Sequence, residues 1–89
     1  MECFVYILQS EKNDEYYVGS TEDVESRLNQ HNSGNVQATR NKAPYKIVFF
    51  QCFESVSLAR RAEMKIKSWK RRDFIEKIIK QGKIKFMDA

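Results

Sequence analysis

The sequence predicts an α+β fold in which a small three-stranded antiparallel sheet is flanked by helices, in the order β-β-α-β-α-α. Two runs rich in β-branched and aromatic residues, 3–8 and 16–19, flank a short polar loop, which is typical of a hairpin. A third such run spans residues 45–53. Apolar residues then recur at helical spacing towards the end of the chain, which predicts two closing helices.

The length of 89 residues predicts a single domain spanning residues 1–89, because separate hydrophobic cores need a longer chain. The longest run of aliphatic and aromatic side chains, residues 47–50, is far too short to cross a membrane. No basic segment followed by an apolar stretch opens the chain, so a signal peptide is not expected. We therefore expect a cytoplasmic protein with no membrane partner.

The predicted hairpin carries one tyrosine on each strand. Tyr6 lies on the same alternation as Phe4 and Leu8, and Tyr17 shares a face with Gly19. Tyrosines on neighbouring antiparallel strands can meet across a hairpin, although each alone is more typical of packing than of catalysis. The glycine predicts a bulge or a close approach to the backbone.

A helix start signal follows the hairpin at residues 20–23, where Ser20 or Thr21 is the expected cap. This helix should end at about Asn32. Arg27 and His31 are four residues apart and therefore project on the same side of the helix. Two isolated surface residues of this kind usually have no function. Arg27 and His31 are therefore candidates for a site only if they lie beside the tyrosines.

The strand at residues 45–53 is apolar on both alternations, which predicts a central strand covered on both faces. Its Cys52 and the Cys3 of the first strand lack the spacing of a zinc site. We expect both to be small buried thiols.

The two closing helices are predicted from their apolar stripes, the second of which ends near Gly82. Glu63 lies just beyond the edge of the first stripe and is the only acid in residues 55–70. Its basic neighbours could simply neutralise it, or it could hold Mg²⁺, which takes one or two protein carboxylates. The stripes are formed by Leu58, Ala62, Ile66 and Trp69, and by Phe74, Ile75, Ile78 and Ile79.

Most of the 16 Lys and Arg residues lie in the helical half of the chain, and the net charge is +4. They form either a solvated helix face or a surface that neutralises backbone phosphates without reading bases. The loop of residues 35–42 is a second candidate substrate-facing segment. The candidate nucleic-acid-binding residues are Arg40, Lys42, Lys65, Lys67, Lys70, Arg71 and Arg72.

These residues together resemble a known enzyme family. Phe4-Val5-Tyr6 followed by Tyr17-Val18-Gly19 resembles the GIY-YIG nuclease signature, with Phe4 in place of the opening glycine. Arg27, His31 and Glu63 follow in the order of that family's other active-site positions. The resemblance covers nearly the whole chain and includes residues 65–70, which are similar to the tail of small stand-alone members.

The resemblance implies a metal-dependent endonuclease that hydrolyses phosphodiester bonds, with DNA as the expected substrate in repair, recombination or processing. It implies one divalent cation, Mg²⁺ or Mn²⁺, held by Glu63. Tyr6 would act as general base towards water, and Tyr17 would orient water or phosphate. Arg27 would stabilise phosphoryl charge, and His31 would assist proton movement.

Two alternatives remain open from the sequence. Many family nucleases use an asparagine near the end of the catalytic domain, and this chain has none after Asn41. A nucleic-acid-binding module without catalysis is therefore one alternative, and a nuclease subunit that needs a protein partner is another. The sequence leaves open DNA or RNA, branched or linear substrates, and the oligomeric state.

Overall fold

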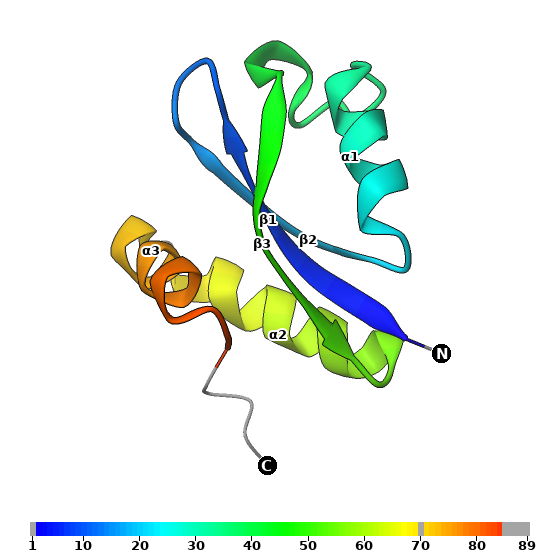
Figure 1. Ribbon diagram of the computed structural model, residues 1–89, viewed down its shortest axis with the longest axis vertical. Coiled ribbons are helices and arrows are strands. Elements are labelled where there is room, and N and C mark those ends of the chain that lie inside the picture. Colours follow the sequence, from blue (N-terminus) through cyan, green and yellow to red (C-terminus); the bar gives the residue numbers. More distant parts are fainter. Residues whose placement is uncertain (1, 70, 85–89) are drawn as a thin grey trace.

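The computed structural model describes residues 2–69 and 71–84. Figure 1 shows a sheet with helices around it, and the predicted element order is confirmed. The elements are β1 (Cys3–Ser10), β2 (Tyr16–Thr21), α1 (Val24–Asn32), the short 3-10 helix η1 (Arg40–Lys42), β3 (Tyr45–Phe53), α2 (Val56–Trp69) and α3 (Arg72–Gln81).

The three strands are antiparallel and lie in the order β2-β1-β3. The prediction that residues 45–53 form the central strand is wrong, because β1 holds that position. Residues 5–8 of β1 are at most 1% exposed, whereas Phe50 of β3 is 58% exposed. Both runs are apolar on both alternations, but only β1 is covered by strands on both edges and by helices on both faces.

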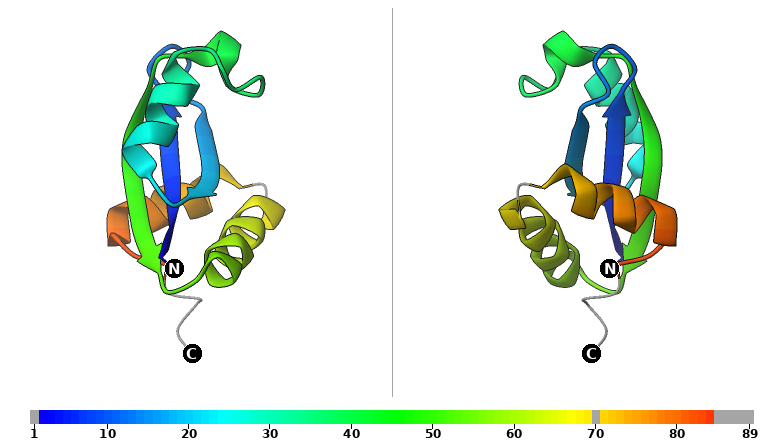
Figure 2. Two further views of the ribbon diagram at one scale, coloured as in Figure 1. Left: turned by 90° about the vertical axis from the view of Figure 1, so that its right-hand side faces the viewer. Right: turned by 90° about the vertical axis from the view of Figure 1, so that its left-hand side faces the viewer.

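The sheet separates two apolar layers, with α1 on one face and α2 and α3 on the other (Figure 2). The smaller layer, under α1, is built from Tyr6, Leu8 and Tyr45. The larger layer lies under α2 and α3 and includes Val5, Ile7, Val18, Phe49, Ala62, Ile66 and Ile78. The alternation of side chains in β1 thus sends Tyr6 to the α1 face.

The helix boundaries differ from the prediction at one end. Asp23 caps α1, and its carboxylate accepts a hydrogen bond from the Ser26 backbone N–H, so the predicted caps were wrong. Ser20 and Thr21 instead end β2. The predicted end of the last helix is confirmed, because Gly82 follows α3 with a positive φ of 77°.

The cysteines are free and occupy different environments. Cys3 is buried as expected, but Cys52 is exposed near the end of the edge strand β3, so the prediction of two buried thiols was wrong for Cys52. Among the described residues, no helix is long and apolar enough to cross a membrane.

Candidate active site

Tyr6 and Tyr17 lie diagonally across the hairpin rather than directly opposite one another. Tyr6 pairs with Gly19 and Leu8 pairs with Tyr17, and the two tyrosine ring centroids are 6.4 Å apart. A Cβ atom on Gly19 would lie 2.6 Å from Tyr6 Cζ and still closer to the hydroxyl. The expected close approach at Gly19 is therefore confirmed, and what approaches the glycine is the Tyr6 side chain.

His31 joins the hairpin to the loop that precedes β3. Its Nε2 atom is 3.0 Å from the Tyr6 hydroxyl, and its Nδ1 atom is 2.7 Å from the Thr39 hydroxyl. His31 and Thr39 are both fully buried, and Tyr6 is 1% exposed. Thr39 was missed from the sequence because it is one hydroxyl in a polar loop, eight residues from its partner.

The positions of the protons follow from the charge state of His31. Burial, and then the charge of Arg27, lower the pKa of His31 to about 4, so the imidazole is neutral at pH 7. The Thr39 hydroxyl is 3.4 Å from the Val36 carbonyl, which can accept its proton. We assign the Nδ1–H tautomer, in which Nδ1 donates to Thr39 and Nε2 accepts from the Tyr6 hydroxyl.

Arg27 extends from α1 towards the same hydroxyls. Burial raises the pKa of Tyr6, and hydrogen bonding with Arg27 acts against this rise. The interaction with Tyr6 in turn raises the pKa of Arg27, and Tyr17 contributes in the same direction. In this state Tyr6 is a neutral phenol between a neutral imidazole and a guanidinium cation.

Glu63 projects from α2, which packs on the other face of the sheet, towards Ser20 of β2. Its Oε1 atom accepts a 2.6 Å hydrogen bond from the Ser20 hydroxyl, and its Oε2 atom is 2.7 Å from the Lys67 ammonium. The Glu63 side chain is 17% exposed, and its charge contributes to the raised pKa of Tyr6. Because β2 is an edge strand, a carboxylate on α2 can reach past it.

Lys67 links the carboxylate to the second tyrosine. Its ammonium lies 5.6 Å from the centroid of the Tyr17 ring while it pairs with Glu63. The Tyr17 ring also packs edge-on against His31, with centroids 4.7 Å apart. The structure thus brings together all five side chains that the resemblance implied, from β1, β2, α1 and α2.

A single divalent cation fits this set of donors. Within residues 2–69 and 71–84 there is no group of three His, Cys, Asp or Glu side chains that could enclose a metal. Glu63 is one carboxylate, fixed by Ser20 and neutralised by the displaceable ammonium of Lys67. Mg²⁺ commonly binds to one protein carboxylate and keeps water and phosphate oxygens as its other ligands.

The described candidate nucleic-acid-binding residues of the helices belong to the end of α2 and the start of α3. Arg71 pairs with Asp73, and Arg72 pairs with Glu76. Lys65 and Lys67 lie on the last turns of α2, and Lys70 lies outside the described residues.

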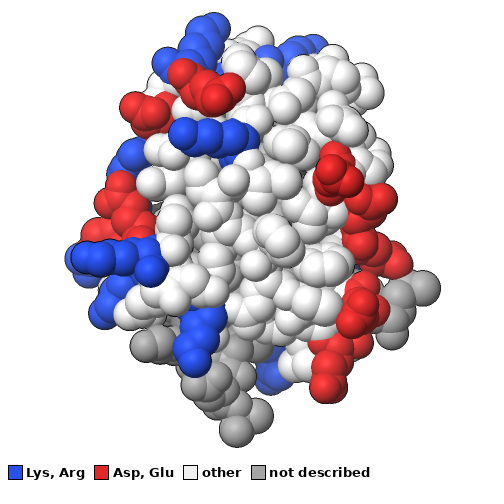
Figure 3. All heavy atoms as spheres, viewed as in Figure 1, with Lys and Arg blue, Asp and Glu red and all other residues white. Residues whose placement is uncertain are grey.

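The candidate residues of the loop lie elsewhere. Lys42 pairs with Glu15 of the hairpin, and the Arg40 guanidinium donates to the Gly34 carbonyl. Figure 3 shows uncharged side chains across the middle of one face, with charged side chains gathered at its margins.

The sheet and its helices are those of a nuclease-type catalytic domain. Residues 2–78 match the family described as the GIY-YIG catalytic domain, and the chain belongs to this family.

The chain covers most of the length of the proteins that it resembles. A UPF0213 protein of Haloquadratum walsbyi is 39% identical over 69 residues, which are 76% of each chain. A UPF0213 protein of Clostridium perfringens is 36% identical over 76 residues, which are 84% of this chain and 81% of the relative. The solution NMR structure of a UPF0213 protein from Bacillus halodurans has a TM-score of 0.58 and 32% identity, covering 92% of this chain and 87% of that one.

Proposed function

We propose that this protein is a metal-dependent endonuclease that hydrolyses phosphodiester bonds in DNA. The observation that carries the proposal is the buried hydrogen-bond network that links Tyr6, His31 and Thr39. Arg27 and Glu63 act electrostatically on the Tyr6 hydroxyl of this network. A protein that kept this fold but had no catalytic activity would not need a buried imidazole that accepts a hydrogen bond from the Tyr6 hydroxyl. Membership of the family supports the class of reaction.

In the proposed mechanism, water attacks the phosphorus atom and gives its proton to the Tyr6 hydroxyl oxygen. Tyr6 passes its own proton to His31 Nε2, so the phenol relays a proton without accumulating as phenolate. Thr39 accepts from Nδ1–H and so stabilises the imidazolium that forms. The bond between phosphorus and the leaving oxygen breaks, and that oxygen takes a proton from solvent. His31 then returns its proton to Tyr6, and the proton that Tyr6 took from water is released to solvent.

The relay is uphill in the resting protein. Burial raises the pKa of Tyr6 and lowers the pKa of His31 to about 4, so both shifts disfavour proton transfer from the phenol to the imidazole. The reaction therefore needs positive charge near the Tyr6 oxygen and the phosphate. Arg27 supplies part of this charge, because it already interacts with the Tyr6 and Tyr17 hydroxyls.

Glu63 is the residue that would hold Mg²⁺ or Mn²⁺, with Ser20 fixing its carboxylate. The bound cation supplies Lewis-acid stabilisation of the phosphoryl and leaving oxygens. Lys67, which holds Glu63 here, would be released towards phosphate. Tyr17 would orient water or phosphate beside it.

The basic side chains would bind the backbone of the substrate. Charge at the α2–α3 junction and in the loop gives affinity that falls with salt and carries little base information. The residues assigned this role are Arg40, Lys42, Lys65, Lys67, Lys70, Arg71 and Arg72.

The test is cleavage of labelled DNA by the whole protein with Mg²⁺, with Mn²⁺ or with EDTA. Linear duplex, single-stranded, flap and four-way-junction substrates cover the main classes. Tyr6→Phe and Glu63→Gln should each lower the rate by about a hundredfold or more. Tyr45→Phe, which removes another phenol of the α1 face, and Glu54→Gln, on an exposed turn, are the matched controls.

Each alternative has its own outcome. Salt-dependent DNA binding without metal-dependent cutting on any substrate would select the non-catalytic binding module. Cutting that begins only when a protein partner is added would select the partner-dependent subunit. Cutting by Tyr6→Phe at the wild-type rate would overturn the assignment of the site.

A further inference from the structure

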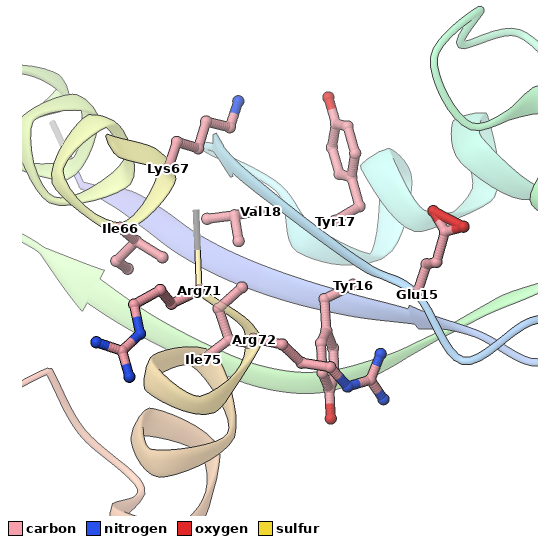
Figure 4. A pocket seen from close by; sticks show the side chains of 9 residues that line it. All are labelled: Glu15, Tyr16, Tyr17, Val18, Ile66, Lys67, Arg71, Arg72 and Ile75. Atoms are coloured by element: carbon pink, nitrogen blue, oxygen red, sulfur yellow. The ribbon is translucent and has the colours of Figure 1, made fainter. Parts of the chain in front are cut away.

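A groove lies beside the candidate site, between β2 and the junction of α2 with α3. Its volume is about 340 Å³. Tyr17 and Lys67 line it and also belong to the site described above, so the two are continuous. Figure 4 shows Tyr17 and Tyr16 on opposite sides of β2, with the groove extending towards α3.

The inner part of the groove is apolar and aromatic. Val18, Ile66 and Ile75 line it together with Tyr16, from β2, α2 and α3. The volume is at the lower end of the range of small-molecule pockets, about 300–1,000 Å³, which suits one planar ring system rather than a folded partner.

Tyr16 is held in place by a cation. The Arg72 guanidinium lies 4.6 Å from the centroid of the Tyr16 ring (Figure 4). Arg72 is positioned by the hydrogen bond that it donates to the Asp14 carbonyl at 2.9 Å, and it also forms an exposed ion pair with Glu76. The phenol and the planar guanidinium form a prepared wall of the kind on which nucleobases stack.

The rim of the groove is positively charged. Lys67, Arg71 and Arg72 line it, against one acid, Glu15. The Arg71 and Arg72 ion pairs are at least half exposed, and exposed pairs of this kind are weak enough for a phosphate to compete. An apolar, aromatic inner part with a cationic rim is complementary to a nucleotide, whose base is flat and apolar-faced and whose phosphate is anionic.

We propose that this groove binds one unpaired nucleotide of the strand that is cut, next to the scissile phosphate. The inference rests on the proposed nuclease function, because Lys67 and Tyr17 join the groove to that site. A base inside a duplex is stacked and paired and cannot enter a side groove, whereas an unpaired base can. The substrate class is therefore nucleic acid with an unpaired nucleotide at the cleavage position, such as a flap, bulge or branch.

The first test is binding without metal, so that nothing is cut. The ¹³C-methyl signals of Val18, Ile66 and Ile75 are followed by NMR while a thymidine pentanucleotide is added in EDTA, and in parallel a longer, GC-rich blunt duplex that stays fully paired. The pentanucleotide should shift these methyl signals and the duplex should not. If the pentanucleotide leaves these methyl signals unchanged, or if both probes shift them equally, the proposal is overturned.

Variants separate the groove from general charge. Tyr16→Leu removes the aromatic wall and Ile75→Trp fills the groove, and each should weaken pentanucleotide binding by about fivefold or more. Lys77→Met, which removes a cation of α3 that does not line the groove, should change it much less. Thermal unfolding of each variant shows that it is folded; two folded variants that bind as tightly as wild type would contradict the proposal.

The second test is cleavage, and it distinguishes the two proposals. With Mg²⁺, a duplex with one unpaired nucleotide should be cut faster than the fully paired duplex, and Ile75→Trp should remove this difference. Equal rates on both substrates would overturn the groove proposal alone. If neither substrate is cut, the nuclease proposal fails, and the NMR titration still decides whether the groove binds a nucleotide.

Discussion

The Tyr6 hydroxyl lies 3.0 Å from Nε2 of His31, inside a layer where both side chains are almost completely buried. The contact joins a strand to a helix 25 residues later in the chain. The contact places the Tyr6 phenol, whose pKa is raised, beside the neutral imidazole of His31, whose pKa is lowered.

Thr39→Val should lower the cleavage rate by about tenfold to a hundredfold, because the buried Nδ1–H of His31 loses its acceptor. Thr39→Ser restores a hydroxyl and should recover most of the rate. The ¹⁵N chemical shifts of His31 report its tautomer, which a purely structural effect on packing would leave unchanged. A wild-type tautomer in Thr39→Val would contradict the assignment.

Gly19→Ala should lower the free energy of unfolding by about 1–3 kcal/mol, because the new methyl group would overlap the Tyr6 side chain. Urea unfolding measures the change. In a Tyr6→Leu background the same substitution should cost much less, since the overlapping ring and hydroxyl are gone. An equal cost in both backgrounds would show that the Tyr6 ring is not what the methyl group meets.

The stability of the protein should fall as the pH is lowered from 7 towards 4 because of His31. The unfolded imidazole takes up a proton near its ordinary pKa of 6.5, while the folded one stays neutral down to about 4. The unfolded state therefore binds more protons in this window, and the loss from His31 is about 2 kcal/mol between pH 7 and 5.

Urea unfolding of wild type and His31→Gln at several pH values isolates this contribution, because the carboxylates titrate in both proteins. The difference between the two proteins should change across this window and level off below pH 4. A constant difference would contradict a neutral, buried His31.

Lys67→Met should tighten Mn²⁺ binding about fivefold, because the ammonium that neutralises Glu63 is removed. Isothermal titration calorimetry in the absence of DNA measures this directly. The same variant should bind DNA more weakly, since Lys67 is one of the residues proposed to bind the phosphate backbone. Lys77→Met is the matched control, and an unchanged Mn²⁺ affinity in Lys67→Met would place the cation away from Glu63.

The sequence by itself determined the secondary-structure elements and the candidate site residues. Strand and helix periodicities are local, so the hairpin, the helices and the end at Gly82 could be predicted from neighbouring residues. The five side chains from Tyr6 to Glu63 were predicted by their order and type in the resemblance. Their roles in catalysis stay predictions until they are tested.

Only the tertiary structure decided which strand is central and which polar groups meet. β1 and β3 are similarly apolar. Which of them lies at the centre of the sheet depends on the order in which the strands pair, not on the composition of either strand. Thr39 and Ser20 are single hydroxyls whose partners lie 8 and 43 residues away, beyond the reach of any local pattern. Glu63 reaches the site because β2 is an edge strand, which is a property of the whole sheet.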